Sequence, residues 1–296
     1  MLTATVIVAT HKKYKMPKDP LYMPMLVGAA GSDVDCNYVK DDFINIEECD
    51  DKGLSCKRRV EGGISEKNGT FCELTGLYAA WKNINSDYVG LVHYRRHFLS
   101  PRYKGFLNKR GLKTKKEKFD SLFKESELRK YLPDIKVFVP EKRNYYIETL
   151  YSHYGHTHYI KHLDMTRSII KKMYPKYISS FDRVMVQKSG YMFNMMIMRK
   201  DLLNNYCTWL FNILFKLEEE IDKDGCDFSK YQGRIYGRIS ELLFNVWIDR
   251  MFRCGKLRMD EIMELPYIHM EKIDMKRKAL SFIKAKLFNK KYESSF

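Results

Sequence analysis

Two adjacent arginines follow a short apolar segment and stand beside aromatic side chains. Residues 88–92 are mostly apolar, and His93, Tyr94, Arg95 and Arg96 come directly after them. Guanidinium groups are permanently charged and present planar pairs of donors that match phosphate oxygens. The segment therefore favours a diphosphate ligand, while surface ion pairs are the alternative interpretation of the same two arginines.

Three of the eight histidines, His153, His156 and His158, lie within six consecutive positions. Imidazole nitrogens bind metal ions, but the sequence has no pair of histidines four residues apart with a general-base glutamate between them. Three interpretations stay open for this cluster. It is a metal site, a set of hydrogen-bond partners for sugar hydroxyls, or a group of ordinary half-buried histidines.

A carboxylate, Glu241, lies where the sequence predicts the start of a helix near Ser240. A carboxylate there can act as the general base that removes a proton from an acceptor hydroxyl. The helix macrodipole stabilises an acidic residue at the same place, so a structural role fits equally well. The chain lacks the glycine-rich dinucleotide motif, the phosphate-binding loop and the nucleophile elbow, which removes the usual support for an oxidoreductase, a P-loop kinase or a serine hydrolase.

Strands and helices are predicted to alternate along most of the chain, which is typical of an α/β fold. Apolar, β-branched segments predict strands at residues 3–9, 87–92, 136–140 and 189–199. Apolar residues at helical spacing predict helices within residues 71–83, at 202–220 and from about Ser240 onward. Residues 33–63 read as loops and short elements of uncertain type.

The composition limits the classes of partner. Lysine and arginine number 53 against 37 acidic residues, so the formal charge of +16 favours nucleic acid, anionic lipid or a pyrophosphate-bearing substrate. Seven scattered cysteines without a C-x-x-C pair indicate reduced cytosolic thiols. The lysine-rich residues 102–129 predict an exposed, partly helical insertion, or else a flap that faces an acceptor or a membrane.

Both ends of the chain bear on membrane contact. The first ten residues lack the basic region of a signal peptide and predict a strand instead. No segment approaches the roughly 20 apolar residues of a membrane-spanning helix, so membrane contact is expected to be peripheral. Residues 272–292 predict a basic amphipathic helix that suits an anionic membrane interface. A C-terminal helix docked on the domain is the alternative.

Several segments taken together resemble a bacterial family long catalogued as a domain of unknown function, whose members occur as capsular, exopolysaccharide and O-antigen glycosyltransferases. The similar segments are residues 6–12, 64–68, 72–78, 81–83, 88–98, 194–198 and 239–247. The combination is specific, and it spans residues 3 to about 250.

This resemblance implies an α/β fold of the GT-A type, with a Rossmann-like nucleotide half and a mixed sheet flanked by helices. Residues 1–250 would form the catalytic domain, and residues 251–296 a basic helical tail near the membrane. The implied donor-binding residues are Thr10, His11, Lys12, Ser65, Lys67, Asn68, His93, Arg95 and Arg96. Asn194, His153, His156 and His158 would bind the sugars, and Glu241 would be the base of an inverting reaction.

The resemblance also bears on metal dependence. Domains of this type commonly hold a divalent cation with an Asp-x-Asp motif at a strand end, where this chain has His93, Tyr94 and Arg95. We expect Arg95 and Arg96 to replace the charge of the metal, so that no cofactor is required; Mn²⁺ or Mg²⁺ is the alternative. The family has Thr-Gly-Asp-Asn where this chain has Val60, Glu61, Gly62 and Gly63.

The expected function is transfer of a hexose, such as galactose in pyranose or furanose form, from a UDP-sugar to a lipid-linked or oligosaccharide acceptor. The enzyme would be cytoplasmic and peripheral at the inner face of the cell membrane, with an anionic membrane surface as a partner and no specific nucleic acid. A nucleic-acid or other polyanion-binding protein is one alternative. A catalytically inactive scaffold of a polysaccharide assembly complex is the other.

Overall fold

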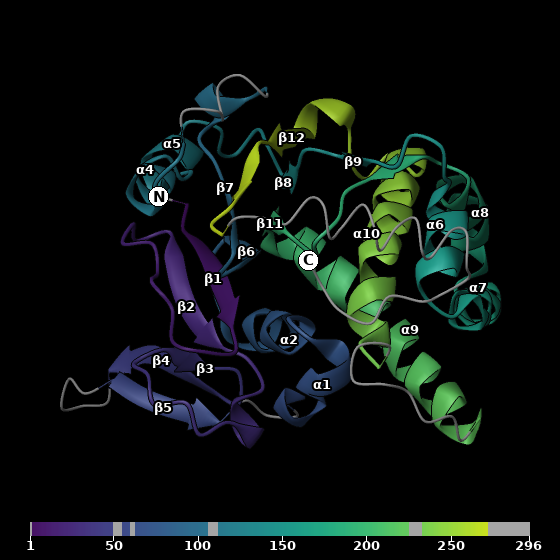
Figure 1. Cartoon of the computed structure of the whole chain (residues 1–296), viewed down its shortest axis with the longest axis horizontal. Coiled ribbons are helices and arrows are strands. Elements are labelled where there is room, and N and C mark those ends of the chain that lie inside the picture. Colours follow the sequence, from purple (N-terminus) through teal and green to yellow (C-terminus); the bar gives the residue numbers. More distant parts are fainter. Residues whose placement is uncertain (1, 50–54, 60–62, 106–111, 225–232, 272–296) are drawn as a thin grey trace. The chain divides into compact units, whose positions relative to one another are not determined.

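The computed structural model describes residues 2–49, 55–59, 63–105, 112–224 and 233–271 (Figure 1). These residues divide into two compact units. The first, which we call the sheet unit, comprises Met1–Glu141, Asn194–Cys207 and Asp260–Glu271. The second, which we call the helical unit, is built from Lys142–Phe193 and Thr208–Met259.

The sheet unit contains a mixed sheet whose centre is parallel. Strand β1 (Ala4–Thr10) pairs in parallel with β2 (Tyr22–Leu26) on one side and with β6 (Tyr88–His93) on the other (Figure 1). Beyond β6, β11 (Met196–Arg199) is antiparallel to both β6 and β8 (Val137–Pro140), and β12 (Ile262–Leu265) is parallel to β8. Beyond β2 follow β3 (Val39–Lys40), β4 (Phe43–Cys49) and β5 (Ser55–Arg59). A short hairpin leads from β6 to β7 (Arg96–Phe98), which pairs with β13 (Tyr267–His269).

The central strands are apolar because both of their faces are covered. Val6, Ile7 and Val8 in β1 have no exposed surface, as expected for a parallel strand with elements on both faces. Gly90 in β6 is required by close packing, since a Cβ atom there would lie 2.7 Å from the carbonyl oxygen of Met196. The strands predicted at residues 3–9, 87–92 and 136–140 are confirmed, as is the mixed α/β fold with helices that flank the sheet.

Short helices complete the sheet unit. They are α1 (Asn68–Phe71), α2 (Leu74–Asn83), α4 (Lys115–Asp120) and α5 (Glu125–Leu128), with 3-10 turns at Ala29–Gly31, Ser65–Lys67 and Pro101–Tyr103. The predicted helix is α2, whose buried residues Leu74, Leu77 and Ala80 share one face. In the lysine-rich insertion, α4 begins with a capping box formed by Thr114 and Glu117. Residues 106–111 of this insertion lie outside the described part of the chain.

The helical unit is built around α10 (Ile235–Arg253), most of which is buried. It also contains α6 (Leu150–Thr157), α7 (Ile160–Met173), a 3-10 turn at Pro175–Tyr177 and α8 (Ile178–Met185), which contacts α10. An ion pair between Arg183 of α8 and Asp249 of α10, at 3.2 Å, supports that contact. A two-stranded ribbon joins β9 (Arg143–Asn144) to β10 (Ser189–Gly190). Helix α9 (Lys200–Asp224) begins in the sheet unit and continues in the helical unit.

Several predicted elements differ from those observed. The strand predicted at 189–199 is two strands, β10 and β11, because Phe193 (φ 76°) and Asn194 (φ 52°) adopt left-handed conformations between them. The helix expected from Ser240 begins at Ile235. Part of the segment assigned to a helical tail forms the 3-10 turn Met259–Glu261 and strands β12 and β13. The predicted tail helix at 272–292, like Val60, Glu61 and Gly62, lies outside the described residues.

None of the described helices combines the length and the apolarity needed to cross a membrane.

Candidate functional site

The carboxyl ends of β1 and β6 bring two of the predicted donor-binding segments together. The strands run in parallel, and their register pairs Ala9 with His93. The backbone N–H of Tyr94 donates to the carbonyl of Ala9 at 3.1 Å, so the residues after both strands leave the sheet at one edge. In open α/β sheets this edge is the usual place for a ligand. Residues 10–12 and 93–95 therefore lie side by side at this edge.

The ring of Tyr94 is the centre of this edge and is only 6% exposed. The rings of His11 and Tyr14 pack against it at centroid distances of 5.4 and 5.0 Å. The ammonium of Lys12 and the guanidinium of Arg95 lie 5.4 and 5.3 Å from its centroid. Cations at this distance from a ring face are attracted to it. Two positive charges are thereby held at the end of the parallel strands.

The first residue after β1 shapes the turn. Thr10 is 1% exposed, and its hydroxyl donates to the carbonyl of Lys12 at 2.7 Å and accepts from the N–H of Lys12 at 3.2 Å. These bonds leave Thr10 facing inward, whereas His11 and Lys12 are exposed. Of the predicted residues 10–12, the last two therefore have exposed side chains and the first does not.

The two arginines occupy different positions. Arg95 lies in the turn after β6, where its carbonyl accepts from the N–H of Met270 at 2.9 Å. Arg96 is the first residue of β7 and pairs with His93 on one side and His269 on the other. Arg95 is therefore the arginine that the structure brings to the Tyr94 ring, while a diphosphate contact for Arg96 stays a prediction.

A second cluster at the same edge centres on Glu73, which the sequence analysis did not select. The side chain of Glu73 is 13% exposed and lies directly before α2. Its Oε1 accepts from Nδ2 of Asn194 at 2.6 Å and lies 3.8 Å from Nε2 of His93. The predicted residues His93 and Asn194, far apart in the sequence, therefore meet at one carboxylate.

The backbone around Glu73 is strained. Cys72 has φ 54° and ψ −133°, and Asn194 has φ 52°, in regions that residues with a side chain rarely adopt. Such conformations cost of order 1–3 kcal/mol each and tend to occur at functional sites. Asn68, a predicted donor-binding residue, donates to the carbonyl of Cys72 at 2.7 Å and to the hydroxyl of Thr75 at 3.2 Å. Its side chain thus braces the strained turn.

Ser65 belongs to a third cluster, around the buried carboxylate of Asp41. Asp41 is 1% exposed and accepts from the N–H groups of Gly28 at 2.8 Å and Ala29 at 3.0 Å, and from the hydroxyl of Ser65. Ser65 in turn accepts from the N–H of Ala30 at 3.1 Å. A buried carboxylate needs such donors. The Ser65 hydroxyl therefore holds the loop after β2, and half-buried Lys67 follows two residues later.

The three clustered histidines do not share one partner. Thr149 caps α6, and this places His153 and His156 on the side of Glu148, which is 4% exposed. Their Nδ1 atoms lie 2.8 and 2.6 Å from its two oxygens. His158 instead lies 3.1 Å from Nη1 of Arg238. Within the described residues, no group of three His, Cys, Asp or Glu side chains is arranged to hold a metal ion.

Burial and hydrogen bonding shift the pKa values of Glu148 and His153 in opposite directions. Burial alone would raise the pKa of Glu148, but hydrogen bonds from His153 and His156 lower it overall. For His153, burial lowers the pKa and outweighs the hydrogen bond to Glu148. The pair is therefore most stable with the carboxylate ionised and the imidazole neutral.

Glu241 is the seventh residue of α10 rather than its first. It therefore lies beyond the first turn, where the helix macrodipole would stabilise a carboxylate. Its carbonyl accepts from Nδ2 of Asn245 at 2.8 Å. Asn245 also bonds both the N–H and the carbonyl of Tyr191, each at 2.8 Å. Asn245 was not predicted, and it anchors the segment that follows β10 within the helical unit.

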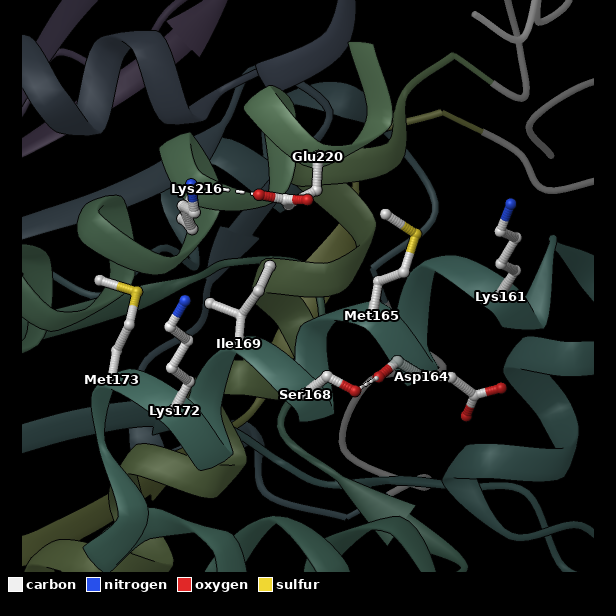
Figure 2. Close-up of a pocket in the computed structure, with 9 residues that line it drawn as sticks. All are labelled: Lys161, Asp164, Met165, Ser168, Ile169, Lys172, Met173, Lys216 and Glu220. Carbon is white, nitrogen blue, oxygen red and sulfur yellow. Dashed lines mark hydrogen bonds and ion pairs between the residues drawn. The ribbon is translucent and has the colours of Figure 1, made fainter. Parts of the chain in front are cut away.

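A hollow of about 450 Å³ lies between α7 and α9 in the helical unit (Figure 2). Met165, Ile169 and Met173 from α7 contribute apolar surface, while Lys216 and Glu220 of α9 form an ion pair at 3.1 Å. Lys161, Asp164, Ser168 and Lys172 complete its lining. It contains none of the predicted site residues.

Comparisons with known proteins agree with the resemblance seen in the sequence. A family model described as a domain of unknown function (DUF4422) matches residues 5–251. The fold is similar to the apo structure of the WbbM bifunctional glycosyltransferase, with a TM-score of 0.74 and 28% sequence identity over 91% of this chain. The chain spans about half of that protein, 46% of its length. A comparison with curated proteins gave no match. From the family match, the chain belongs to the DUF4422 family.

Proposed function

We propose that this chain is a hexosyltransferase that uses a nucleotide-diphosphosugar donor. The observation that carries the proposal is the meeting of residues 10–12 and 93–95 at the carboxyl ends of two parallel strands. Lys12 and Arg95 supply positive charge there, and a diphosphate needs such charge. The similarity to a solved glycosyltransferase supports the same class of reaction.

The side chains at this edge do not fit a divalent cation. Mn²⁺ and Mg²⁺ prefer carboxylate and other oxygen ligands. The described edge offers the imidazoles of His11 and His93, the phenols of Tyr14 and Tyr94 and two cations, and its carboxylate, Glu73, already accepts a hydrogen bond from Asn194. We therefore propose that Arg95 and Arg96 neutralise the diphosphate in place of a metal. A loss of activity in a chelator, restored by manganese, would contradict this.

The remaining roles follow from the chemistry of each residue. Glu241 would accept the proton of the acceptor hydroxyl as oxygen attacks the anomeric carbon, which gives inversion. Asn194, His153, His156 and His158 would donate hydrogen bonds to sugar hydroxyls. Glu73 would act as a positioning residue, because it holds Asn194 by a 2.6 Å hydrogen bond.

We further propose that the donor is a UDP-hexose, with galactose as the sugar, and that the acceptor is a lipid-linked glycan of capsule, exopolysaccharide or O-antigen synthesis. The enzyme would work in the cytoplasm as a peripheral protein at the inner face of the membrane. The positive charge of +16 supports a location beside anionic lipids.

A thermal-shift screen of the whole chain against nucleotide-diphosphosugars, with and without Mn²⁺, tests the donor site. A ligand that binds the folded state at 100 times its Kd stabilises that state by about 2.7 kcal/mol. We expect metal-independent stabilisation by one UDP-sugar and its loss in Arg95→Ala, with Arg102→Ala as a control. Stabilisation by no nucleotide, together with salt-sensitive binding to duplex DNA or RNA, would favour a polyanion-binding protein.

A further inference from the structure

Among the mostly exposed large apolar side chains of the helical unit, three lie in two segments that are joined by backbone hydrogen bonds: Tyr146 at 76%, Ile147 at 65% and Val186 at 67%. We call them the apolar corner. Tyr146 and Ile147 lie between β9 and α6, and Val186 directly follows α8. An exposed apolar group of this kind is typical of a surface that binds a partner or a membrane.

Backbone hydrogen bonds hold the two segments of the apolar corner together. The strands β9 and β10 pair in antiparallel fashion, and the N–H of Tyr145 continues the pairing to the carbonyl of Lys188 at 2.8 Å. The N–H of Leu150 donates to the carbonyl of Gln187 at 2.7 Å. Residues 146–149 are thus bounded on both sides by bonds to residues 187–188, next to Val186.

The loop holds its apolar side chains outward in a strained conformation. Tyr146 has φ 57°, which is an outlier for a bulky residue. Its N–H donates to Oδ1 of Asn144 at 2.8 Å, and the N–H of Ile147 donates to the carbonyl of Tyr145 at 2.7 Å. The next residue, Glu148, turns inward and is bonded to two histidines. Strain that keeps apolar groups in water indicates a function for their exposure.

Basic residues lie within four positions of the apolar corner in the sequence. Lys142 and Lys188 are exposed, and half-buried Arg143 lies in β9. The acidic residue nearest in sequence to Val186 is Asp182, whose carboxylate is bonded to Arg167 at 2.7 and 2.8 Å. The charge that the corner presents is therefore complementary to an anionic surface.

We propose that the apolar corner inserts into the interface of an anionic lipid bilayer. Tyr146, Ile147 and Val186 would enter the boundary between headgroups and acyl chains, where tyrosine is enriched, while Lys142 and Lys188 contact phosphates. Three side chains are too few for a stable protein interface, which buries about 800 Å² on each partner. A bilayer needs no such area, because each inserted group adds to the binding.

Fluorescence of the full chain with brominated lipid vesicles tests the proposal. The parent chain already contains three tryptophans, so each variant is compared with it. Relative to the parent chain, we expect Tyr146→Trp to show an added blue shift and added quenching on vesicles of equal phosphatidylglycerol and phosphatidylcholine, and neither on phosphatidylcholine alone. Met259→Trp is the matched control, because Met259 is 73% exposed in the same unit and outside the corner. Quenching at position 259 but not 146, or no quenching at either, would overturn the proposal.

A second variant measures the contribution of the corner to binding. Ile147→Ser combined with Val186→Ser should weaken partition onto the anionic vesicles by about tenfold or more. Unchanged partition would show that the chain reaches the membrane by another surface, such as residues 272–296. Self-association that the double variant abolishes, without lipid quenching, would point to a protein partner and also overturn the proposal. The readouts report insertion rather than sugar transfer, so failure here leaves the proposed reaction untouched.

Discussion

Glu73 in the sheet unit and Glu148 in the helical unit are both largely buried carboxylates near histidines, but they are built differently. Glu148 receives His153 and His156 from the helix that begins two residues later. Glu73 meets His93 from β6 and Asn194 from the segment before β11. The local cluster has ordinary helical geometry, whereas the long-range one lies between two strained residues, Cys72 and Asn194. From this contrast we predict a mainly structural role for Glu148 and a functional one for Glu73.

The largest effect is expected for Glu73→Gln on catalysis. The neutral amide no longer holds Asn194 and His93 with a charge-assisted interaction, so we expect kcat to fall about 100-fold with little change in melting temperature. Steady-state kinetics with a UDP-sugar identified by the thermal-shift screen would measure it. Glu66→Gln, an exposed residue of the same segment, is the control.

The split between kcat and KM distinguishes positioning from folding. A Glu73→Asp variant that recovers part of kcat would support a positioning role. If Glu73→Gln unfolds the chain or leaves kcat unchanged, Glu73 does not have the functional role that distinguishes it from Glu148.

Glu148→Gln should instead act mainly on stability and lower it by about 2 kcal/mol, because two imidazoles lose an ionised partner. Any effect on sugar binding through His153 and His156 should appear in KM rather than in kcat. The contribution of Glu148 is present at neutral pH and is lost as the pH falls through its lowered folded pKa, below the ordinary 4.5. Denaturant unfolding at pH 7 would measure the loss. Glu219→Gln, at an exposed surface ion pair, should change stability by less than about 1 kcal/mol.

His97 is the case of a histidine without a carboxylate. It is fully buried in β7, and burial lowers its pKa from 6.5 to about 3 despite the opposing effect of the Tyr94 backbone. Because the pKa of His97 is lower in the folded chain than in the unfolded one, its contribution to stability is fully present above pH 6.5 and is lost as the pH falls toward 3. Within that window, each unit by which the pH falls lowers the free energy of unfolding by up to about 1.4 kcal/mol.

His97→Leu should flatten the stability profile between pH 6.5 and 4.5, as measured by urea unfolding at several pH values. A variant at His97 with the parent slope would mean that other groups, such as Glu148 and His153, dominate acid unfolding.

The smallest effect on stability is expected for Asn194→Gly. Glycine relieves the left-handed strain at φ 52°, while the hydrogen bond to Glu73 is lost, so the two changes offset to within about 1 kcal/mol. Activity should nevertheless fall about tenfold if the amide holds a sugar or Glu73 in place. Thermal melts and initial rates on the same preparation separate the two effects, and undiminished activity would remove Asn194 from the site.

The sequence alone determined the central strands and the helices that flank them. Residues 3–9 and 87–92 are short, apolar segments that end in polar residues, and the period and length of such segments are local properties. The same reasoning predicted residues 10–12 and 93–95 as site residues, because ligands gather where parallel strands end. The break between β10 and β11 escaped it, since nothing in a run of apolar residues signals left-handed conformations at Phe193 and Asn194.

Only the tertiary structure decided which side chains meet. Glu73 reads in the sequence as an acidic residue before a helix, and its contact with Asn194 joins residues 121 positions apart. Asp41 likewise lies in a segment of uncertain type until the turn after β2 directs two N–H groups at it. Hydrophobic periodicity encodes which face of an element is buried, but not which distant partner covers it. The polar contacts of the site depend on that partner, and so on the register of strands far apart in the chain.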